Sequence, residues 1–377
     1  MAQRAVIASV VFAAACGVKA RQVSESRAGA YEAALATGRD GFAVAWHDLR
    51  DGNAEIYLRL LDAAGHPASP ERRLTDSPEA SYEPSLERLG DGVVVAWYEQ
   101  TNTGERTTML GEWNRDGSRN WVHAIAPSSR NAVVRSDGRE IFCAWIQMDA
   151  DQSEAVWAGR WDRSGHELRP AVRLGPASAT TWNLNAALDQ SGGAWVVFDA
   201  ADSTRANELF LARVDASGTH FLRLTSDDGA ASKYPDVSIA TDGRVAITWY
   251  DERDGNEEVY LLTAAASELT GDVEARARRV TTTPGQSMGA YLAWNAGRVG
   301  LAWTDTIDGQ HEVYFRLFDA DGAPLGDASR ITQNDTWSLV PAIRAWRDGF
   351  ALAWNEYRPA SAEIHDGTSE VAFALVK

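Results

Sequence analysis

The sequence predicts an all-β fold, a seven-bladed β-propeller of four-stranded antiparallel blades in which an N-terminal strand joins the last blade and closes the ring. Three observations predict it: a repeat of about fifty residues, Asp-Gly turns between short apolar runs, and a spare strand at one end of the chain that matches a missing strand at the other. The 377 residues include 15 Trp and 31 Gly, which is typical of many short strands joined by tight turns.

The repeat is clearest in the run GVVVAWYE (Gly92 to Glu99), which recurs along the chain with an aromatic residue near its end. Seven copies, separated by 48 to 54 residues, fill residues 16–377 as a single domain without a linker. The aromatic residues that mark the copies are Trp46, Trp97, Trp145, Phe198, Trp249, Trp303 and Trp354. Such a period indicates either a propeller or a solenoid.

Each copy contains four short strands. Residues 82–89 are typical of an entry strand, and Asp91-Gly92 then forms a two-residue hairpin turn. Residues 93–97 are continuously apolar, which indicates a second strand packed on both faces. After a longer loop, residues such as 55–61 form the third strand, and Arg72 to Thr75 form the fourth.

The two ends of the chain favour a ring over a solenoid. The last copy stops after its third strand, Val371 to Val376, and the chain begins with an unassigned fourth strand, Ala20 to Ser24. The segment Ala20 to Ser26 lines up with Arg72 to Ser77. We therefore expect the N-terminal strand to complete the seventh blade, because closure pairs edges that an open array would leave exposed.

Residues 1–15 have the pattern of a signal peptide, with Arg4 before the apolar stretch Val6 to Ala15. The sequence before Cys16 favours a lipoprotein-type cleavage that makes Cys16 the lipidated first residue, and cleavage after Ala20 is the alternative. In either case we expect an exported protein, anchored at the bacterial cell envelope or secreted. Contact with a membrane is then expected only through the N-terminal lipid.

The formal net charge of -17 argues against nucleic acid as a partner, because phosphate backbones need neutralising Lys and Arg. An acidic surface favours a neutral ligand, a cation or a basic partner, or serves solubility alone. Once Cys16 is set aside as an anchor, Cys143 remains in an apolar run and is expected to be buried. No disulfide, Cys-based metal site or cofactor is expected, and we expect a monomer.

The runs AWHDLRDGNAEIY, TWYDERDGNEEVY and AWTDTIDGQHEVY, which begin at Ala45, Thr248 and Ala302, resemble the Trp-x-Asp-x-Arg-x-Gly-x-x-x-Ile-Tyr repeat of exported bacterial and archaeal propellers. Those proteins are often described as TolB-like or sialidase-like. The resemblance covers all seven repeats and implies architecture only. The chain lacks the extra domain of TolB and has seven repeats instead of six, and it lacks the sialidase Ser-x-Asp-x-Gly-x-Thr-Trp boxes and an assignable arginine triad. Neither function is therefore implied.

In a propeller, the loops between second and third strands open on the same face as the connections between blades. Tyrosine and tryptophan rings there, among carboxylates and amides, suit a sugar, because its ring stacks on the aromatics while polar groups bind its hydroxyls. The candidate ligand-binding residues of the blade entries are Tyr31, Glu32, Tyr82, Glu83, Trp182, Asn183 and Tyr234.

Acids that recur two residues after the marker Trp have a different interpretation. They are Asp48, Glu99, Asp251, Asp305 and Glu356. A residue found in most blades is expected to do the same local task in each, and an Asp can accept backbone N–H bonds and fix its own loop. We expect these acids to be structural.

Specificity is expected where the repeat breaks. Blade two replaces its loop with a segment containing Asn102, blade three has Asp149 and Asp151, and blade seven has a longer loop with Tyr357, Arg358 and His365. Asp149 and Asp151 with Glu154 also provide alternating oxygen ligands of the kind that calcium prefers. The alternative is that these acids only keep the loop solvated.

These patterns favour a non-catalytic binding or scaffold propeller that recognises a glycan or an envelope protein. The sequence contains no nucleophile elbow, zinc spacing or phosphate-binding loop. The alternative is a glycoside hydrolase or lyase with carboxylates at the mouth of the central channel. A third hypothesis is a part that only stabilises an envelope complex.

Overall fold

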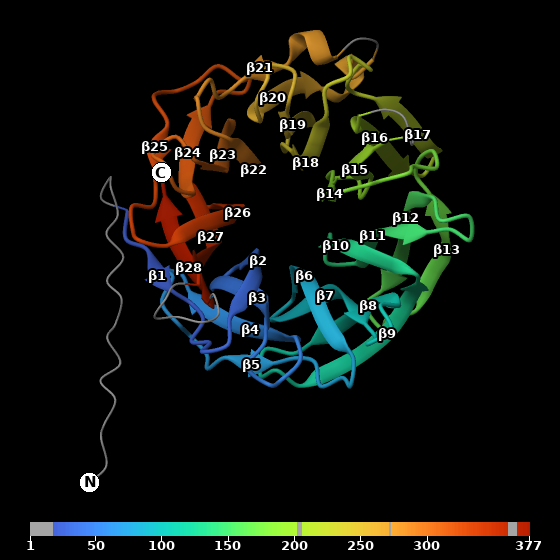
Figure 1. Ribbon diagram of the computed structural model, residues 1–377. Coiled ribbons are helices and arrows are strands. Elements are labelled where there is room, and N and C mark those ends of the chain that lie inside the picture. The colour runs from blue at the N-terminus through green and yellow to red at the C-terminus, as the bar shows by residue number, and fades with distance from the viewer. Residues whose placement is uncertain (1–17, 202–205, 271–272, 361–367) are drawn as a thin grey trace.

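The computed structural model describes residues 18–201, 206–270, 273–360 and 368–377. Seven four-stranded antiparallel sheets stand around a central axis like blades, which confirms the predicted seven-bladed propeller (Figure 1). Two short 3-10 turns, η1 (Ala266–Glu268) and η2 (Glu274–Arg276), are the helical elements of these residues. No helix in the described part of the chain is long and apolar enough to cross a membrane.

The first strand of each blade lies nearest the axis. In order of blades one to seven these inner strands are β2 (Ala30–Gly38), β6 (Ala80–Leu89), β10 (Ser129–Ser136), β14 (Leu184–Leu188), β18 (Ser232–Ile239), β22 (Ser287–Asn295) and β26 (Trp337–Trp346).

The second strands carry the continuous apolar runs, and they are almost entirely buried because each is packed on both faces by neighbouring blades. They are β3 (Gly41–Asp48), β7 (Gly92–Gln100), β11 (Glu140–Met148), β15 (Ala194–Ala200), β19 (Arg244–Asp251), β23 (Arg298–Asp305) and β27 (Gly349–Arg358).

The third and fourth strands complete each blade toward the outside. The third strands are β4 (Glu55–Asp62), β8 (Arg106–Trp113), β12 (Glu154–Asp162), β16 (Glu208–Asp215), β20 (Glu258–Ala265), β24 (Glu312–Phe318) and β28 (Thr368–Val376). The outer strands, from blade one, are β5 (Arg72–Arg73), β9 (Arg119–Pro127), β13 (Glu167–Arg173), β17 (Gly218–Arg223), β21 (Arg278–Arg279), β25 (Ser329–Arg330) and, in blade seven, β1 (Arg21–Gln22).

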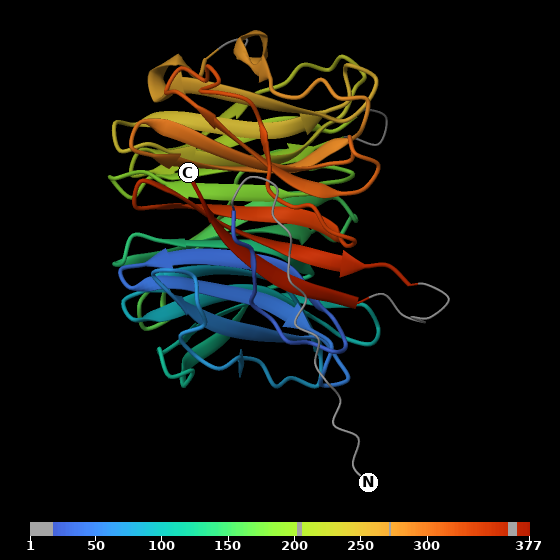
Figure 2. The same ribbon diagram turned by 90° about the vertical axis from the view of Figure 1, so that its left-hand side faces the viewer.

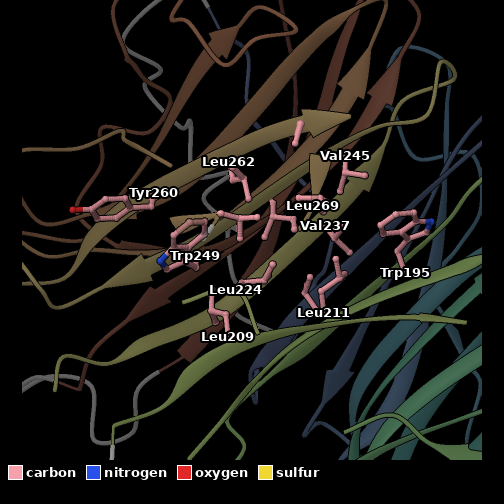
Figure 3. Close-up of a cluster of buried hydrophobic side chains, with 14 residues drawn as sticks. Trp195, Leu209, Leu211, Leu224, Val237, Val245, Trp249, Tyr260, Leu262 and Leu269 are labelled. Atoms are coloured by element: carbon pink, nitrogen blue, oxygen red, sulfur yellow. The ribbon is translucent and has the colours of Figure 1, made fainter. Parts of the chain in front are cut away.

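The hydrophobic core is divided among the contacts between neighbouring blades. Figure 3 shows the cluster between blades four and five, where Trp195 and Leu211 of blade four face Val237 and Trp249 of blade five. Another cluster joins the last blade to the first by packing Phe373 with Phe42. Because the buried apolar surface lies between blades and not inside one, each blade depends on both neighbours for its stability.

The N-terminal strand completes blade seven as predicted. Residues of β1 pair with Phe373 and Ala372 of β28, and the Val23 N–H donates to the Val371 carbonyl at 2.7 Å. The Ser24 hydroxyl accepts a hydrogen bond from the Val371 N–H at 2.7 Å and donates one to the Glu370 carboxylate. Segments more than 340 positions apart thus share one sheet, which leaves no gap in the ring (Figure 1).

The strands run between two loop-bearing faces, as the view from the side shows (Figure 2). Loops between second and third strands and connections between blades lie on one face, and the tight hairpin turns lie on the other. We call the first of these the entry face. On this face the side-chain amide of Asn53, in a loop of blade one, donates to the carbonyls of Ser77 and Glu79 in the connection to blade two at 3.1 Å, which joins the two kinds of segment.

Candidate functional site

The inner strands share an unusual backbone feature where they begin at the entry face. A register shift, characteristic of a β-bulge, interrupts their pairing with the second strand in every blade except blade four. Left-handed residues lie inside these bulges, namely Glu32, Glu83, Asn131, Tyr234, Gly289 and Val340, with φ between 48° and 58°. For a non-glycine residue this conformation costs about 1–3 kcal/mol, and such residues cluster at functional sites.

The bulges surround a cavity of about 400 Å³ at the entry-face mouth of the central channel. A bulge changes the direction in which the neighbouring side chains point, so residues of different blades converge on this cavity. The polar and aromatic side chains that line this cavity, here called the mouth cavity, are Glu32, Glu83, Ser85, Asn131, Asn183, Asn185, Tyr234 and Tyr291. The mouth cavity therefore combines aromatic surface with carboxylate and amide groups.

Aromatic rings of blades one and two pack against one another beside the mouth cavity. The rings of Tyr31 and His47 stack at 5.4 Å between centroids, and His47 meets Tyr82 edge-on at 5.2 Å. Tyr82 in turn contacts Tyr98 at 5.6 Å. The two partly exposed tyrosines, Tyr31 and Tyr82, are thus supported by the buried rings of His47 and Tyr98.

Two carboxylates at the same repeat position share the mouth cavity. Glu32 is exposed, and its Oε2 lies 3.1 Å from Nδ1 of the buried His47. Glu83 has no hydrogen bond or ion pair to the described residues, and burial together with the charge of Glu32 raises the pKa of Glu83 to about 8. At neutral pH this arrangement keeps a proton on Glu83.

The buried carboxylate of Asp199 fixes the wall of the mouth cavity at blade four, the blade whose inner strand has no bulge. Asp199 accepts backbone N–H bonds from Trp182, Asn183 and Tyr234 at 2.6–3.2 Å, and one from the amide of Asn207 at 2.9 Å. Burial nevertheless raises the pKa of Asp199 to about 6. Because Tyr234 belongs to blade five, this carboxylate sets the position of a cavity residue across a blade boundary.

Only some of the candidate ligand-binding residues come together. Glu32, Glu83, Asn183 and Tyr234 line the mouth cavity, with Tyr31 and Tyr82 adjacent to the first two in the chain. The Trp182 side chain is 47% exposed beside them. Asn102 and Arg358 are exposed in blades two and seven and do not line the cavity, and His365 lies outside the described residues.

The blade-three loop acids have local partners. The Asp151 carboxylate accepts bonds from the Ser153 N–H and hydroxyl, and Asp149 lies 3.9 Å from Arg173. Glu154 binds Arg130 at 2.8 Å instead of facing the two aspartates. Among residues 18–201, 206–270, 273–360 and 368–377, no three His, Cys, Asp or Glu side chains are grouped as a metal ion would require.

The acids that recur after the marker Trp lie in a repeated hydrogen-bond arrangement. The Trp indole N–H donates to the acid two residues later, as from Trp46 to Asp48 at 2.9 Å, and Asp48 also accepts bonds from Ser26 and Arg50. The same indole-to-acid bond occurs at Asp251, Asp305 and Glu356. Glu99 occupies this position in blade two, where burial raises its pKa.

Several residues at the site were not expected from the sequence. Asn131 and Tyr291 line the mouth cavity, His47 and Asp199 position its walls, and Trp337 stands 5.7 Å from Tyr357. Aligning the inner strands on Ala30, Ser81 and Ser129 would have found Asn131, because it follows Ser129 by two residues, as Glu32 and Glu83 follow Ala30 and Ser81. Contacts such as Asp199 with Tyr234 leave no comparable signal, because the two residues belong to different repeats.

The fold and this site define the class of protein, a closed seven-bladed β-propeller with a cavity at one channel mouth. No protein family model matches the sequence, and no curated protein matches it either. Its structure is similar to solved propeller-like structures, however. One is a protein of unknown function from Dyadobacter fermentans, 12% identical with a TM-score of 0.56, covering 94% of this chain and 98% of that one.

Two further solved structures are similar to this chain at comparable levels. The β-propeller domain of the Trilobed protease from Pyrococcus furiosus, described as having an open velcro topology, is 10% identical with a TM-score of 0.54, covering 92% of this chain and 95% of that one. The α-L-arabinanase of Penicillium chrysogenum complexed with arabinobiose is 11% identical with a TM-score of 0.52, covering 78% and 92%. At such identities the similarity shows the fold alone.

Proposed function

We propose that this protein is a non-catalytic binding propeller that recognises a neutral glycan in the mouth cavity. The observation that carries the proposal is the composition of that cavity: tyrosine rings, such as Tyr234 and Tyr291, stand beside carboxylate and amide groups in one concave space. Pockets of this kind, with few convergent polar groups on a rigid scaffold, are the usual ligand sites of proteins.

The chemistry of a sugar matches these groups. The apolar face of a pyranose ring stacks on an aromatic ring, and its hydroxyls donate to carboxylates and exchange hydrogen bonds with amides. The exposed carboxylate of Glu32 in the cavity, together with the net charge of -17, disfavours a polyanionic glycan. The strained bulges that hold these side chains in place support a role beyond folding.

We place this binding activity at the cell envelope. The proposal rests on the signal-peptide pattern of residues 1–15 and on Cys16, which lie outside the described residues. Radiolabelled palmitate incorporated by the expressing bacterium should label the wild-type chain and not Cys16→Ser. Label in neither chain, with the protein free in the medium, would indicate secretion without an anchor.

A glycan array probed with the purified propeller tests the binding proposal directly. Neutral glycans should be retained by the wild type and lost in the double variant Asn131→Ala/Asn183→Ala, which removes two amides from the cavity wall. The control is Asn120→Ala, which removes an amide on the opposite face that exchanges hydrogen bonds with Asn114. An empty array, or binding that survives the double variant, would refute the mouth cavity as a glycan site and favour a protein partner.

Glycoside hydrolysis is the second candidate function, and one observation favours it. Glu32 and Glu83 occupy equivalent positions in adjacent blades, and the raised pKa of Glu83 suits a general acid while the exposed Glu32 suits a base or nucleophile. Release of nitrophenol from neutral aryl glycosides would reveal this activity. Glu83→Gln should abolish turnover but retain binding, and the absence of turnover by the wild type would leave the binding role alone.

A further inference from the structure

Four aromatic side chains lie on the entry face of three consecutive blades. Trp337 and Tyr357 belong to blade seven and contact each other at 5.7 Å, Tyr31 belongs to blade one, and Tyr82 belongs to blade two. We call these four residues the aromatic arc. All four keep part of their surface open to solvent, and Trp337 is 37% exposed.

The rings of the aromatic arc are held in place from behind. His311 of blade six contacts Trp337 at 5.0 Å between ring centroids. His47 lies between Tyr31 and Tyr82, within 5.4 Å of both rings. Such support reduces the conformational entropy that the rings would lose when a ligand stacks on them, so they form a preorganised surface.

The aromatic arc is continuous with the mouth cavity. Tyr31 and Tyr82 immediately precede Glu32 and Glu83, which line that cavity. Blade seven joins on at the other side, because the Asn355 amide, two residues before Tyr357, donates to the carbonyl of Ala30, the residue before Tyr31, at 2.9 Å. A ligand in the cavity can therefore extend over the rings without leaving the protein surface.

The same surface is different in the other blades. At the repeat position of Tyr31 and Tyr82, blade three has Arg130 and blade five has Lys233, each in an ion pair with a nearby glutamate. Blade six has Met288 there. Among the described residues of the entry face, a run of partly exposed aromatic rings therefore lies over blades seven, one and two, and blade three, with Arg130, separates it from the exposed Trp182 of blade four.

We propose that the ligand is an oligosaccharide of several sugar rings, with one end in the mouth cavity and the rest stacked along the aromatic arc. This inference rests on the proposed function and specifies its ligand class. We expect the part of the oligosaccharide that lies over the aromatic arc to be uncharged, because stacking on Trp and Tyr uses the apolar faces of the sugar rings. Affinity therefore increases with the number of sugar rings until the arc is covered.

Calorimetric titration with neutral oligosaccharides of increasing length tests the inference. The probes are cello-, xylo- and chito-oligosaccharides, each from the monosaccharide to the hexasaccharide. For the series that binds, the hexasaccharide should bind the wild type at least tenfold more tightly than the monosaccharide. Trp337→Ala should weaken hexasaccharide binding about tenfold, as expected for the loss of one stacked ring, and leave monosaccharide binding unchanged.

Two other variants separate stacking from a fault in folding. Trp337→Phe keeps an aromatic ring and should retain most of the gain with chain length. Phe221→Ala, which removes an aromatic side chain of similar exposure from the outer strand β17, should not change binding at any length. Equal far-ultraviolet circular dichroism of all variants is the check on their fold.

The outcomes distinguish this inference from the proposed function. Equal affinity for mono- and hexasaccharide, or equal weakening of both by Trp337→Ala, would refute the aromatic arc as a subsite while leaving the mouth cavity as a glycan site. Failure of all three series to bind at any length would overturn the proposed function and the inference together.

Discussion

Removing the hydroxyl of Ser24 should weaken the closure of the ring and lower the free energy of unfolding of the whole propeller. Ser24 is fully buried, donates its O–H to Glu370 and accepts the N–H of Val371 at 2.7 Å. These bonds hold the N-terminal segment to the last blade. In Ser24→Ala the buried N–H of Val371 and the half-buried carboxylate of Glu370 both lose this hydroxyl.

The expected magnitude follows from these two losses. A hydrogen bond to a charged carboxylate contributes about 1.5–3 kcal/mol, and a buried N–H left without a partner costs about 1–3 kcal/mol. Glu370 retains one bond, from the Ser26 N–H at 3.1 Å, which limits the loss at the carboxylate. We therefore expect Ser24→Ala to lower the free energy of unfolding by about 2–4 kcal/mol at pH 8.

The loss should be smaller in acid. Burial raises the pKa of Glu370 to about 7, and the Ser24 hydroxyl opposes that rise because it stabilises the charged form. At pH 5 the carboxyl is protonated in the folded protein, so the bond from Ser24 is then an ordinary neutral one. The difference between wild type and Ser24→Ala should therefore fall to about 1–2 kcal/mol at pH 5.

Urea denaturation followed by Trp fluorescence measures these differences, and blade one provides the matched control. Thr75 donates to Glu55 and accepts the Ile56 N–H at 2.8 Å, which is the arrangement that Ser24 makes with Glu370 and Val371. The four strands of blade one follow one another in the chain, so this pair of bonds does not depend on docking of the N-terminus. Thr75→Val should therefore cost a similar amount. If Thr75→Val lowers stability while Ser24→Ala does not, the N-terminal strand is not docked in solution and the closure argument fails.

Three further predictions concern other buried groups. Burial raises the pKa of Glu208 to about 7, so its contribution to stability is complete below about pH 4.5 and is lost as the pH rises through 7. Between these pH values the free energy of unfolding should therefore fall less for Glu208→Gln than for the wild type. Parallel curves of stability against pH would contradict this. A Cβ on Gly92 would lie 2.2 Å from the Trp113 carbonyl oxygen, so Gly92→Ala should lower the free energy of unfolding by about 1–3 kcal/mol in the same urea assay. An unchanged urea midpoint would show that the turn relaxes to accept the methyl group. Burial raises the pKa of the Cys143 thiol, so Ellman's reagent should react with it only after unfolding, and rapid reaction of the native protein would argue against its burial.

Much of the candidate site could be predicted because the repeat itself specifies a surface. Strand order within each copy puts the blade entries on one face, which is why Glu32, Glu83, Asn183 and Tyr234 could be named and do line one cavity. The blade-three acids were named because the repeat breaks in their loop, yet Asp151 bonds within its own turn. A sequence break marks a loop, but it does not say whether that loop turns toward the axis.

The sequence alone determined the architecture of this protein. Seven apolar runs of equal period, Asp-Gly turns and matching chain ends specify blades, their strand order and their closure, because these depend on local patterns and on the pairing of exposed edges. The tertiary structure decided which side chains meet. The mouth cavity is built from bulged strands about fifty positions apart, and contacts such as Asp199 with Tyr234 or His47 with Tyr82 depend on how neighbouring blades twist and pack, which no local pattern records.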